Sequence, residues 1–196
     1  MRWWVIVIGL IGLLLIGWQL RYALLIGLEK PSYVVIGKKD GYEIRQYKDY
    51  LTAQVFASGS YDEASNEGFK ILANYIFGEN SENKSMPMTA PVFMQEKNKG
   101  YKVAFVMPSE YSMSTLPKPR DKRIIIKKVS GKKVAAYRFT WCATKKRVEK
   151  RENEFVRLLD RDDIKTRSEV QLARYNPPFI LPFLMRNELL VDISGS

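Results

Sequence analysis

The chain has 196 residues, of which 46% are apolar and 27% are charged, so its length allows one ordinary domain with a small appendage. Its formal net charge is +11 at pH 7, and it contains no histidine and a single cysteine. These counts exclude a Ser-His-Asp or Cys-His nucleophile, a histidine-ligated zinc or haem, an internal disulfide and a CxxC redox pair. What remains is a binding protein, or an enzyme built from carboxylates, tyrosine, lysine or methionine.

The first thirty residues are expected to form a membrane anchor. Trp3 to Leu20 carries no charge, and as a helix this run would extend about 27 Å, close to the roughly 30 Å hydrocarbon core of a bilayer. Tryptophans lie at both ends of the run, and no small-x-small cleavage site of a signal peptide follows it. We predict a single-pass N-terminal transmembrane helix over about residues 3–28, within an anchor of residues 1–30. The flanking charges leave open which side of the membrane carries the rest of the chain.

Residues 31–196 are read as one α+β domain that begins at Pro31. In its first part, alternation and capping residues predict strands over 42–47 and 51–57, a helix from Asp62 to about Phe77, and strands over 88–95 and 101–107. A proline- and serine-rich stretch then reads as a linker. The second part is expected to contain strands over 123–129 and 134–140, a helix capped by Thr144 and reaching about Leu159, and strands over 169–175 and 188–193.

Both parts follow the order strand, strand, helix, strand, strand, at a nearly constant offset. Ile44 and Ile125 are 81 residues apart, and Pro91 and Pro177 are 86 apart. Such an offset predicts a duplicated ββαββ unit. We expect a pseudo-two-fold, distorted antiparallel β-barrel flanked by two helices, with a cleft between the halves. Its expected divisions are repeat one over about 40–108, a linker over 109–121 and repeat two over about 122–193.

Positive charge is concentrated in the second part of the chain. Fourteen Lys or Arg and only two acids lie between Lys118 and Arg151. Such a run is most often a solvated face, but beside a membrane anchor it also fits anionic lipid headgroups. No RNP-like, zinc-finger or helix-turn-helix pattern accompanies it, so no nucleic-acid partner is expected.

Two proline-rich apolar segments are unusual, Met86 to Val92 and Asn176 to Glu188. Their prolines exclude a regular helix or a central strand. The first is read either as an irregular edge strand packed on the core or as a wall of an apolar ligand pocket. The second is read as a core plug, a ligand lid, or a patch that touches a membrane or a partner. The chain has no P-loop, GxGxxG, GxSxG or HExxH motif, so no catalytic residue is predicted.

Several segments together resemble the SOUL haem-binding protein family, in family order over about residues 33–193. The matching segments are Tyr42 to Tyr47, Gly68 to Asn80, Met86 to Val92, Arg174 to Phe179 and Pro182 to Glu188. The resemblance implies two ββαββ repeats in a distorted barrel. It also implies a pocket for haem or a related tetrapyrrole near the first helix of the domain and the late proline-rich loop. The N-terminal anchor lies outside the resemblance.

The resemblance places thirteen candidate residues around that pocket. Its apolar wall would be formed by Phe69, Leu72, Ala73, Ile76, Met86, Met88, Phe179, Leu181, Phe183 and Met185. Its basic groups for the haem propionates would be Lys70, Lys84 and Arg186. Because the chain has no histidine, haem would be held by packing and charge pairing, or ligated by a tyrosine, a methionine or Cys142. No separate metal site is expected.

The expected function is therefore a membrane-anchored, non-catalytic tetrapyrrole binder that acts as a carrier, buffer or sensor. The alternative is a non-haem envelope module that docks on anionic lipid or a protein partner through its basic face and proline-rich loop. A hydrolase is a third reading, based only on analogy with the similar fold of gyrase-inhibitor-like proteins. It would need a carboxylate or tyrosine with a strongly shifted pKa in the cleft.

Overall fold

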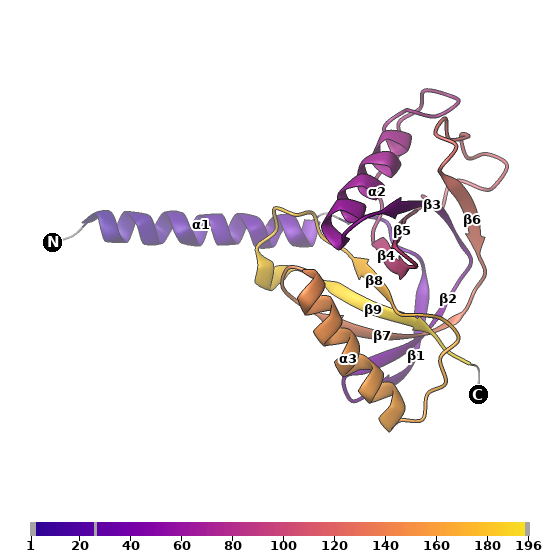
Figure 1. Ribbon diagram of the computed structural model, residues 1–196. Helices are drawn as coiled ribbons and strands as arrows, with labels where there is room; N and C mark the ends of the chain where they lie inside the picture. Colours follow the sequence, from indigo (N-terminus) through magenta and orange to yellow (C-terminus); the bar gives the residue numbers. More distant parts are fainter. Residues whose placement is uncertain (1–2, 26, 195–196) are drawn as a thin grey trace.

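A computed structural model describes residues 3–25 and 27–194, and Figure 1 shows an N-terminal helix extending away from a curled sheet that two further helices flank. The predicted anchor and domain also include residues 1–2, 26 and 195–196, which lie outside the described residues. In chain order the elements are α1 (Trp3–Leu25), β1 (Tyr33–Lys39), β2 (Tyr42–Tyr47), β3 (Tyr50–Ser58), α2 (Tyr61–Ile76), β4 (Val92–Lys97), β5 (Gly100–Val106), β6 (Ile125–Val129), β7 (Lys133–Phe139), α3 (Lys145–Arg161), β8 (Gln171–Arg174), the 3-10 turn η1 (Pro182–Leu184) and β9 (Asn187–Asp192).

The predicted transmembrane helix over about residues 3–28 is not supported by the structure. α1 is helical over Trp3–Leu25. Among the described residues, however, no helix combines the length and the apolar character needed to cross a membrane. The large apolar side chains that the structure describes on α1, from Trp3 to Trp18, are all more than half exposed.

The sheet has internal symmetry. Its nine antiparallel strands lie in the order β1-β2-β7-β9-β8-β4-β5-β3-β6. The strands β2, β3, β4 and β5 of the first repeat correspond to β6, β7, β8 and β9 of the second. When each strand is replaced by its counterpart, the order from β2 to β6 reads the same in reverse, as expected for a duplicated ββαββ unit. The symmetry axis passes between β4 and β8, where Phe93 pairs with Ala173. Strands of the two repeats alternate in the sheet, because β2 pairs with β7 and β3 pairs with β6.

The sheet is an open half-barrel and not the barrel that the sequence predicts. Among the described strands, β1 pairs with β2 and β6 pairs with β3, and neither has a second neighbour. β1 itself is an addition to the predicted elements, and it places a strand at the edge beside β2. Its Val34, Val35 and Ile36 side chains are exposed.

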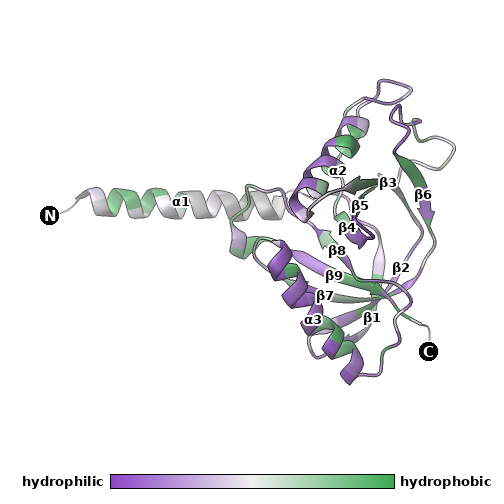
Figure 2. Ribbon diagram, in the orientation of Figure 1, coloured by the Kyte–Doolittle hydropathy of each residue, from purple (hydrophilic) through white to green (hydrophobic). Residues whose placement is uncertain are grey.

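The helices begin at short polar side chains. α2 is capped by Ser60 and not by Asp62, because Ser60 and Glu63 form a capping box in which the Glu63 carboxylate accepts the backbone N–H of Ser60 at 2.9 Å. α3 is capped by Thr144 as predicted, and it continues to Arg161, beyond Leu159. Figure 2 shows that α3 carries mostly hydrophilic residues, with a few hydrophobic ones between them.

The two faces of the sheet carry two separate hydrophobic clusters. On one face, α2 and α3 cover a large cluster that includes Leu72, Phe105, Phe155 and Leu189. The opposite, concave face carries a smaller cluster that includes Tyr47, Phe93, Ala173, Tyr175 and Leu190. Alternate residues of β9 therefore point into different clusters, as the two-residue period of a strand requires.

Candidate functional site

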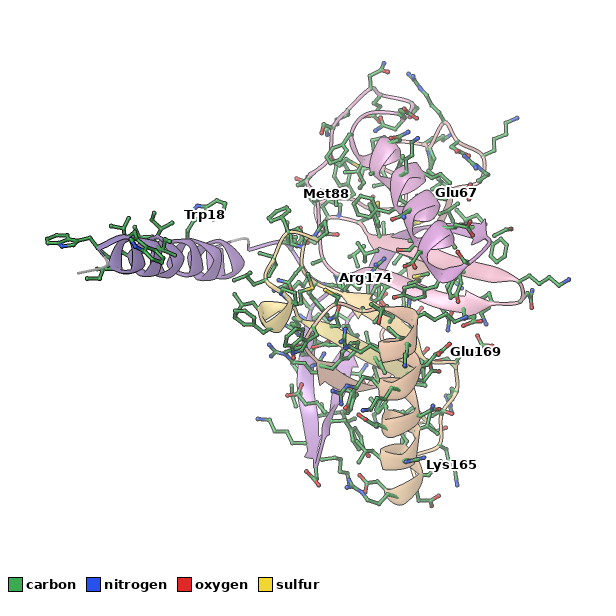
Figure 3. The ribbon with its side chains drawn as sticks, turned by 60° about the vertical axis from the view of Figure 1, so that its left-hand side comes forward. Trp18, Glu67, Met88, Lys165, Glu169 and Arg174 are labelled. Atoms are coloured by element: carbon green, nitrogen blue, oxygen red, sulfur yellow. The ribbon has the colours of Figure 1, made fainter. Side chains whose placement is uncertain are left out.

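Most of the helix and edge-strand residues that were expected to line a pocket lie in the core. Leu72, Ala73, Ile76 and Met86 are buried in the cluster beneath α2, and Met88 packs half-buried against it. Phe69 is the exception, since it is 41% exposed and packs edge-on against Phe105 with ring centroids 5.2 Å apart. Figure 3 shows Met88 on the side of α2 that faces α1.

The predicted loop residues take two different positions. Phe179 and Phe183 are 55% and 50% exposed, whereas Leu181 and Met185 are half-buried. The loop is fixed by Ile180, which was not singled out and is only 2% exposed. Its turn also contacts the strand end at Trp141, whose backbone N–H donates to the carbonyl of Pro182 at 2.9 Å. This arrangement leaves two aromatic side chains about half exposed beside a well-anchored backbone.

The three predicted basic groups lie in different surroundings. Lys70 is exposed on α2. Lys84 lies over the ring of Tyr111 at 5.1 Å, and its hydrogen bond to that phenol raises the pKa of the ammonium group. Arg186 is half-buried over the ring of Tyr175 at 4.2 Å, and its guanidinium donates to Glu188 at 2.7 Å. The structure therefore does not bring these three cations to one place.

Arg186 belongs to a buried charge cluster on the concave face of the sheet. Glu188 is fully buried and accepts hydrogen bonds from Arg45, Arg186 and the Tyr175 hydroxyl, the last at 2.7 Å. Burial acts to raise the pKa of Glu188, but the hydrogen bonds and charge of Arg45, together with Arg186, outweigh it and hold that pKa below its usual value. Through its hydrogen bonds to Arg45, the Glu188 carboxylate links β9 to β2, so we assign it a structural role.

A cavity of about 720 Å³ lies at the base of α1, and we call it the basal cavity. It opens where the chain leaves α1, between the β3 end of the sheet and the segment after β5. The residues that line it are Glu29, Lys30, Pro31, Ser32, Lys48, Asp49, Tyr50, Leu51, Val106, Met107, Pro108, Ser109, Tyr111, Ser112, Met113, Ser114 and Lys128. Its volume is within the roughly 300–1,000 Å³ that is typical of small-molecule sites.

The walls of the basal cavity are held by contacts between distant segments. The carbonyl of Glu29 accepts the backbone N–H of Ala90 at 2.8 Å, and its carboxylate accepts that of Ser109 at 2.7 Å. The adjacent Thr89 hydroxyl donates to the carbonyl of Val106 at 2.6 Å. The proline-rich Met86 to Val92 segment, which the sequence singles out, therefore supports this cavity from outside.

The basal cavity combines an apolar floor with a cationic rim. Leu51, Met107 and Tyr50 supply apolar or half-buried surface, and burial raises the pKa of Tyr50, so that its phenol stays neutral. Lys30 and Lys48 are exposed at the rim. Lys128 also lines it and forms an ion pair with Asp49 at 2.8 Å, which lowers the pKa of that carboxyl. The cavity suits a flat apolar molecule with carboxylates at one edge.

None of the thirteen predicted site residues lines the basal cavity, although Lys84 reaches it through Tyr111. The sequence predicts a linker over 109–121, and Tyr111 and Met113 within it were not assigned to a site. The sequence did contain one indication of a binding surface, because Met107, Tyr111 and Met113 lie within seven residues of one another beside Pro108. Cys142 is exposed and does not line the cavity. The described residues contain no group of three or more His, Cys, Asp or Glu side chains that would hold a metal ion.

Comparisons with known proteins find one family and one fold. A family model described as SOUL heme-binding protein matches residues 28–192. Heme-binding protein 1 of Xenopus laevis is 32% identical over 120 residues, which cover 55% of this chain and 63% of that protein's length, less than two thirds. The C-terminal domain of EcmrR is similar in structure with a TM-score of 0.60 at 8% identity, over 79% of this chain and 99% of that one. A hydrolase from Listeria innocua has a TM-score of 0.52 at 10% identity, over 89% and 96%. At these identities the two structures share the fold alone.

Proposed function

The chain belongs to the SOUL haem-binding protein family, and from this premise we propose that it binds haem or a related tetrapyrrole, without catalysis, in the basal cavity. A relative named Heme-binding protein 1 supports the ligand class. The roles that fit such a site are those of a carrier, buffer or sensor.

The observation that carries the proposal is the basal cavity, in which about 720 Å³ of space meets an apolar floor and lysines at the rim. A porphyrin would bury its apolar ring against Leu51, Met107 and Met113, a gain of about 25 cal/mol for each Å² removed from water. Lys30 and Lys48, which line the same cavity, would pair with its propionates. Bound haem would supply an iron that takes axial ligands and can change oxidation state. Because the chain has no histidine, the candidate ligands in this cavity are tyrosine and methionine side chains.

A hemin titration of the full-length chain in dodecyl maltoside, followed by absorbance, tests this function. The expected result is a Soret shift that saturates near one equivalent. The double variant Lys30→Glu with Lys48→Glu should weaken binding at least about twofold, since each exposed ion pair contributes about 0.2–1 kcal/mol. The matched control is Lys146→Glu with Lys150→Glu, two exposed lysines on α3 that do not line the cavity. Non-saturating uptake, or equal weakening by both pairs, would contradict the proposal.

A second candidate function is attachment to an anionic membrane surface through α1 and the proline-rich loop. It is supported by the exposed Trp141, Phe179 and Phe183 side chains, and by the position of η1 beside the C-terminal end of α1 in Figures 1 and 3. Aromatic side chains favour the bilayer interface, and basic residues near it gain about 1 kcal/mol each from anionic headgroups. The exposed lysines at the start of α3, Lys145 and Lys146, lie close after Trp141 in the chain and would supply that charge.

Cosedimentation with vesicles tests membrane attachment. The full-length chain should sediment with phosphatidylglycerol vesicles more than with phosphatidylcholine vesicles, and salt should reduce the difference. The variant Trp141→Ser with Phe183→Ser should lower the bound fraction, whereas Met113→Ser, another exposed apolar side chain, should leave it unchanged. Equal sedimentation with both lipids would remove the electrostatic part of this function.

A further inference from the structure

A second cavity, which we call the inter-repeat cleft, opens where the N-terminal ends of α2 and α3 approach the β4–β5 hairpin. Its volume is about 260 Å³, so it accepts a ligand much smaller than a tetrapyrrole. Both repeats contribute to its walls. Its apolar and aromatic lining is formed by Tyr61, Met94, Tyr101, Val148, Val170, Leu172 and Leu189, none of which lines the basal cavity.

Two buried tyrosines form the aromatic wall of the inter-repeat cleft. The rings of Tyr61 and Tyr101 are perpendicular, with centroids 5.7 Å apart, and each residue is less than a tenth exposed. The Tyr61 hydroxyl donates to the carbonyl of Ala143 at 2.6 Å, which fixes its ring. Burial raises the pKa of Tyr61 to about 12, so both its ring and its hydroxyl stay neutral at physiological pH. Neutral aromatic faces attract cations, and quaternary ammonium groups above all.

The same cleft is acidic although the chain as a whole is strongly basic. Four carboxylates line it, against the single ammonium of Lys145; they are Glu96, Glu149, Glu152 and Glu169. Lys145 approaches Glu149 at 3.8 Å and also faces Tyr101 and Glu96, while Lys97, outside the lining, pairs with Glu169. Figure 3 shows Glu169 beside α3.

Glu152 is the carboxylate that the protein does not neutralise. It is the most buried of the four, and no described residue donates a hydrogen bond to it or forms an ion pair with it. Burial raises the pKa of Glu152, and repulsion from Glu96, Glu149 and Glu169 raises it further. A positive ligand would relieve this repulsion. The apolar side chains that share the cleft, such as Met94 and Leu172, favour a cation with an apolar body.

We propose that the inter-repeat cleft binds a small organic cation, whose ammonium or quaternary ammonium group lies against Tyr61 and Tyr101 with Glu152 as its counter-ion. The apolar surface of Met94, Leu172 and Leu189 would contact the rest of the ligand. This site is separate from the basal cavity and does not depend on the tetrapyrrole function.

Methionine-methyl NMR of the full-length chain in dodecyl maltoside tests the proposal, because Met94 lines the inter-repeat cleft whereas Met107 and Met113 line the basal cavity. The probe is choline, and its control is 3,3-dimethyl-1-butanol, a neutral molecule of nearly the same shape. Choline should shift the Met94 signal in a saturable manner and leave Met107 and Met113 in place. The neutral control should bind at least about fivefold more weakly, because it lacks the positive charge that Glu152 and the two tyrosine rings would attract.

Two variants assign the effect to Glu152. Glu152→Gln should weaken choline binding at least about fivefold, and its thermal unfolding should show an intact fold, because the change removes a repelled charge. Glu82→Gln removes a carboxylate from an exposed loop outside the cleft and should leave binding unchanged. The proposal is overturned if choline does not move Met94, if the neutral control moves it equally, or if Glu152→Gln binds choline as the unaltered chain does.

Discussion

Arg45 and Glu188 form a buried bidentate ion pair, although 143 residues separate them in the chain. Arg45 Nη1 lies 2.7 Å from Glu188 Oε2, and Nη2 lies 3.1 Å from Oε1. Arg45 is on β2 of the first repeat and Glu188 is on β9 of the second, with β7 between them. The pair therefore joins the two repeats through charge as well as through backbone pairing.

Replacing Glu188 by glutamine should destabilise the chain strongly. The change would leave the Arg45 and Arg186 guanidinium groups without the carboxylate that both contact, and removal of one partner from a buried ion pair costs about 3–5 kcal/mol. Urea unfolding followed by circular dichroism would measure this loss. Glu43→Gln removes the other, 35% exposed partner of Arg45 and should cost much less. Equal losses for the two variants would show that Glu188 has no special role.

The same carboxylate should make stability sensitive to acid. The pKa of Glu188 is lowered in the folded chain, because Arg45 and Arg186 outweigh the effect of burial. Its contribution is therefore complete above the unfolded pKa of about 4.5 and is lost as the pH falls through the folded pKa. The difference in unfolding free energy between the unaltered chain and Glu188→Gln should be constant above about pH 5.5 and shrink below pH 4.5. A difference that grows on acidification would contradict this sign.

Gly68 should not tolerate a side chain. It lies on α2 where the helix approaches β5, and a Cβ there would be 2.5 Å from Cγ2 of Val103. We expect Gly68→Ala to lower the free energy of unfolding by about 1–3 kcal/mol through overpacking. At Gly37 the nearest atoms to a Cβ are 3.6 Å away, so Gly37→Ala should change stability by less than about 0.5 kcal/mol. Thermal unfolding of the two variants would measure the contrast.

The seven methionines allow the tetrapyrrole site to be located directly. Zinc protoporphyrin is diamagnetic, and its ring current should shift the methyl signals of Met107 and Met113 in the basal cavity while leaving Met94 in place. Methionine-methyl NMR of the full-length chain would record these shifts. If Met88 and Met185 shift instead, the ligand lies on the surface implied by the family resemblance, and the basal cavity is the wrong site.

Periodicity and capping were sufficient to predict much of the fold. The apolar residues of α2 at spacings of three and four, with Thr144 before the second domain helix, gave both helices within about two residues. The offset between the halves gave the duplicated unit that the strand order displays. These features are local or repeat along the chain, and a single sequence records them.

Closure of the sheet and the position of the cavity were not predictable in the same way. Whether β1 and β6 meet depends on the curl of the whole sheet, and no residue of either strand encodes that distance. Ala73 and Met86 have the composition of a pocket wall, but only the packing of α2 shows that they are core. The residues of the basal cavity come from four separate parts of the chain, within 29–32, 48–51 and 106–114 and at Lys128, and their meeting depends on tertiary contacts such as that between Glu29 and Ser109.

The exchange of strands between the repeats has a consequence for synthesis on the ribosome. The first repeat emerges before β6 and β7 exist, so β2 and β3 leave the exit tunnel with one hydrogen-bonding edge each that only the second repeat can cover. Exposed strand edges promote intermolecular pairing, and long-range strand pairing forms slowly. A nascent chain that stalls before Lys133 should therefore aggregate or engage chaperones, instead of waiting as a folded half-domain.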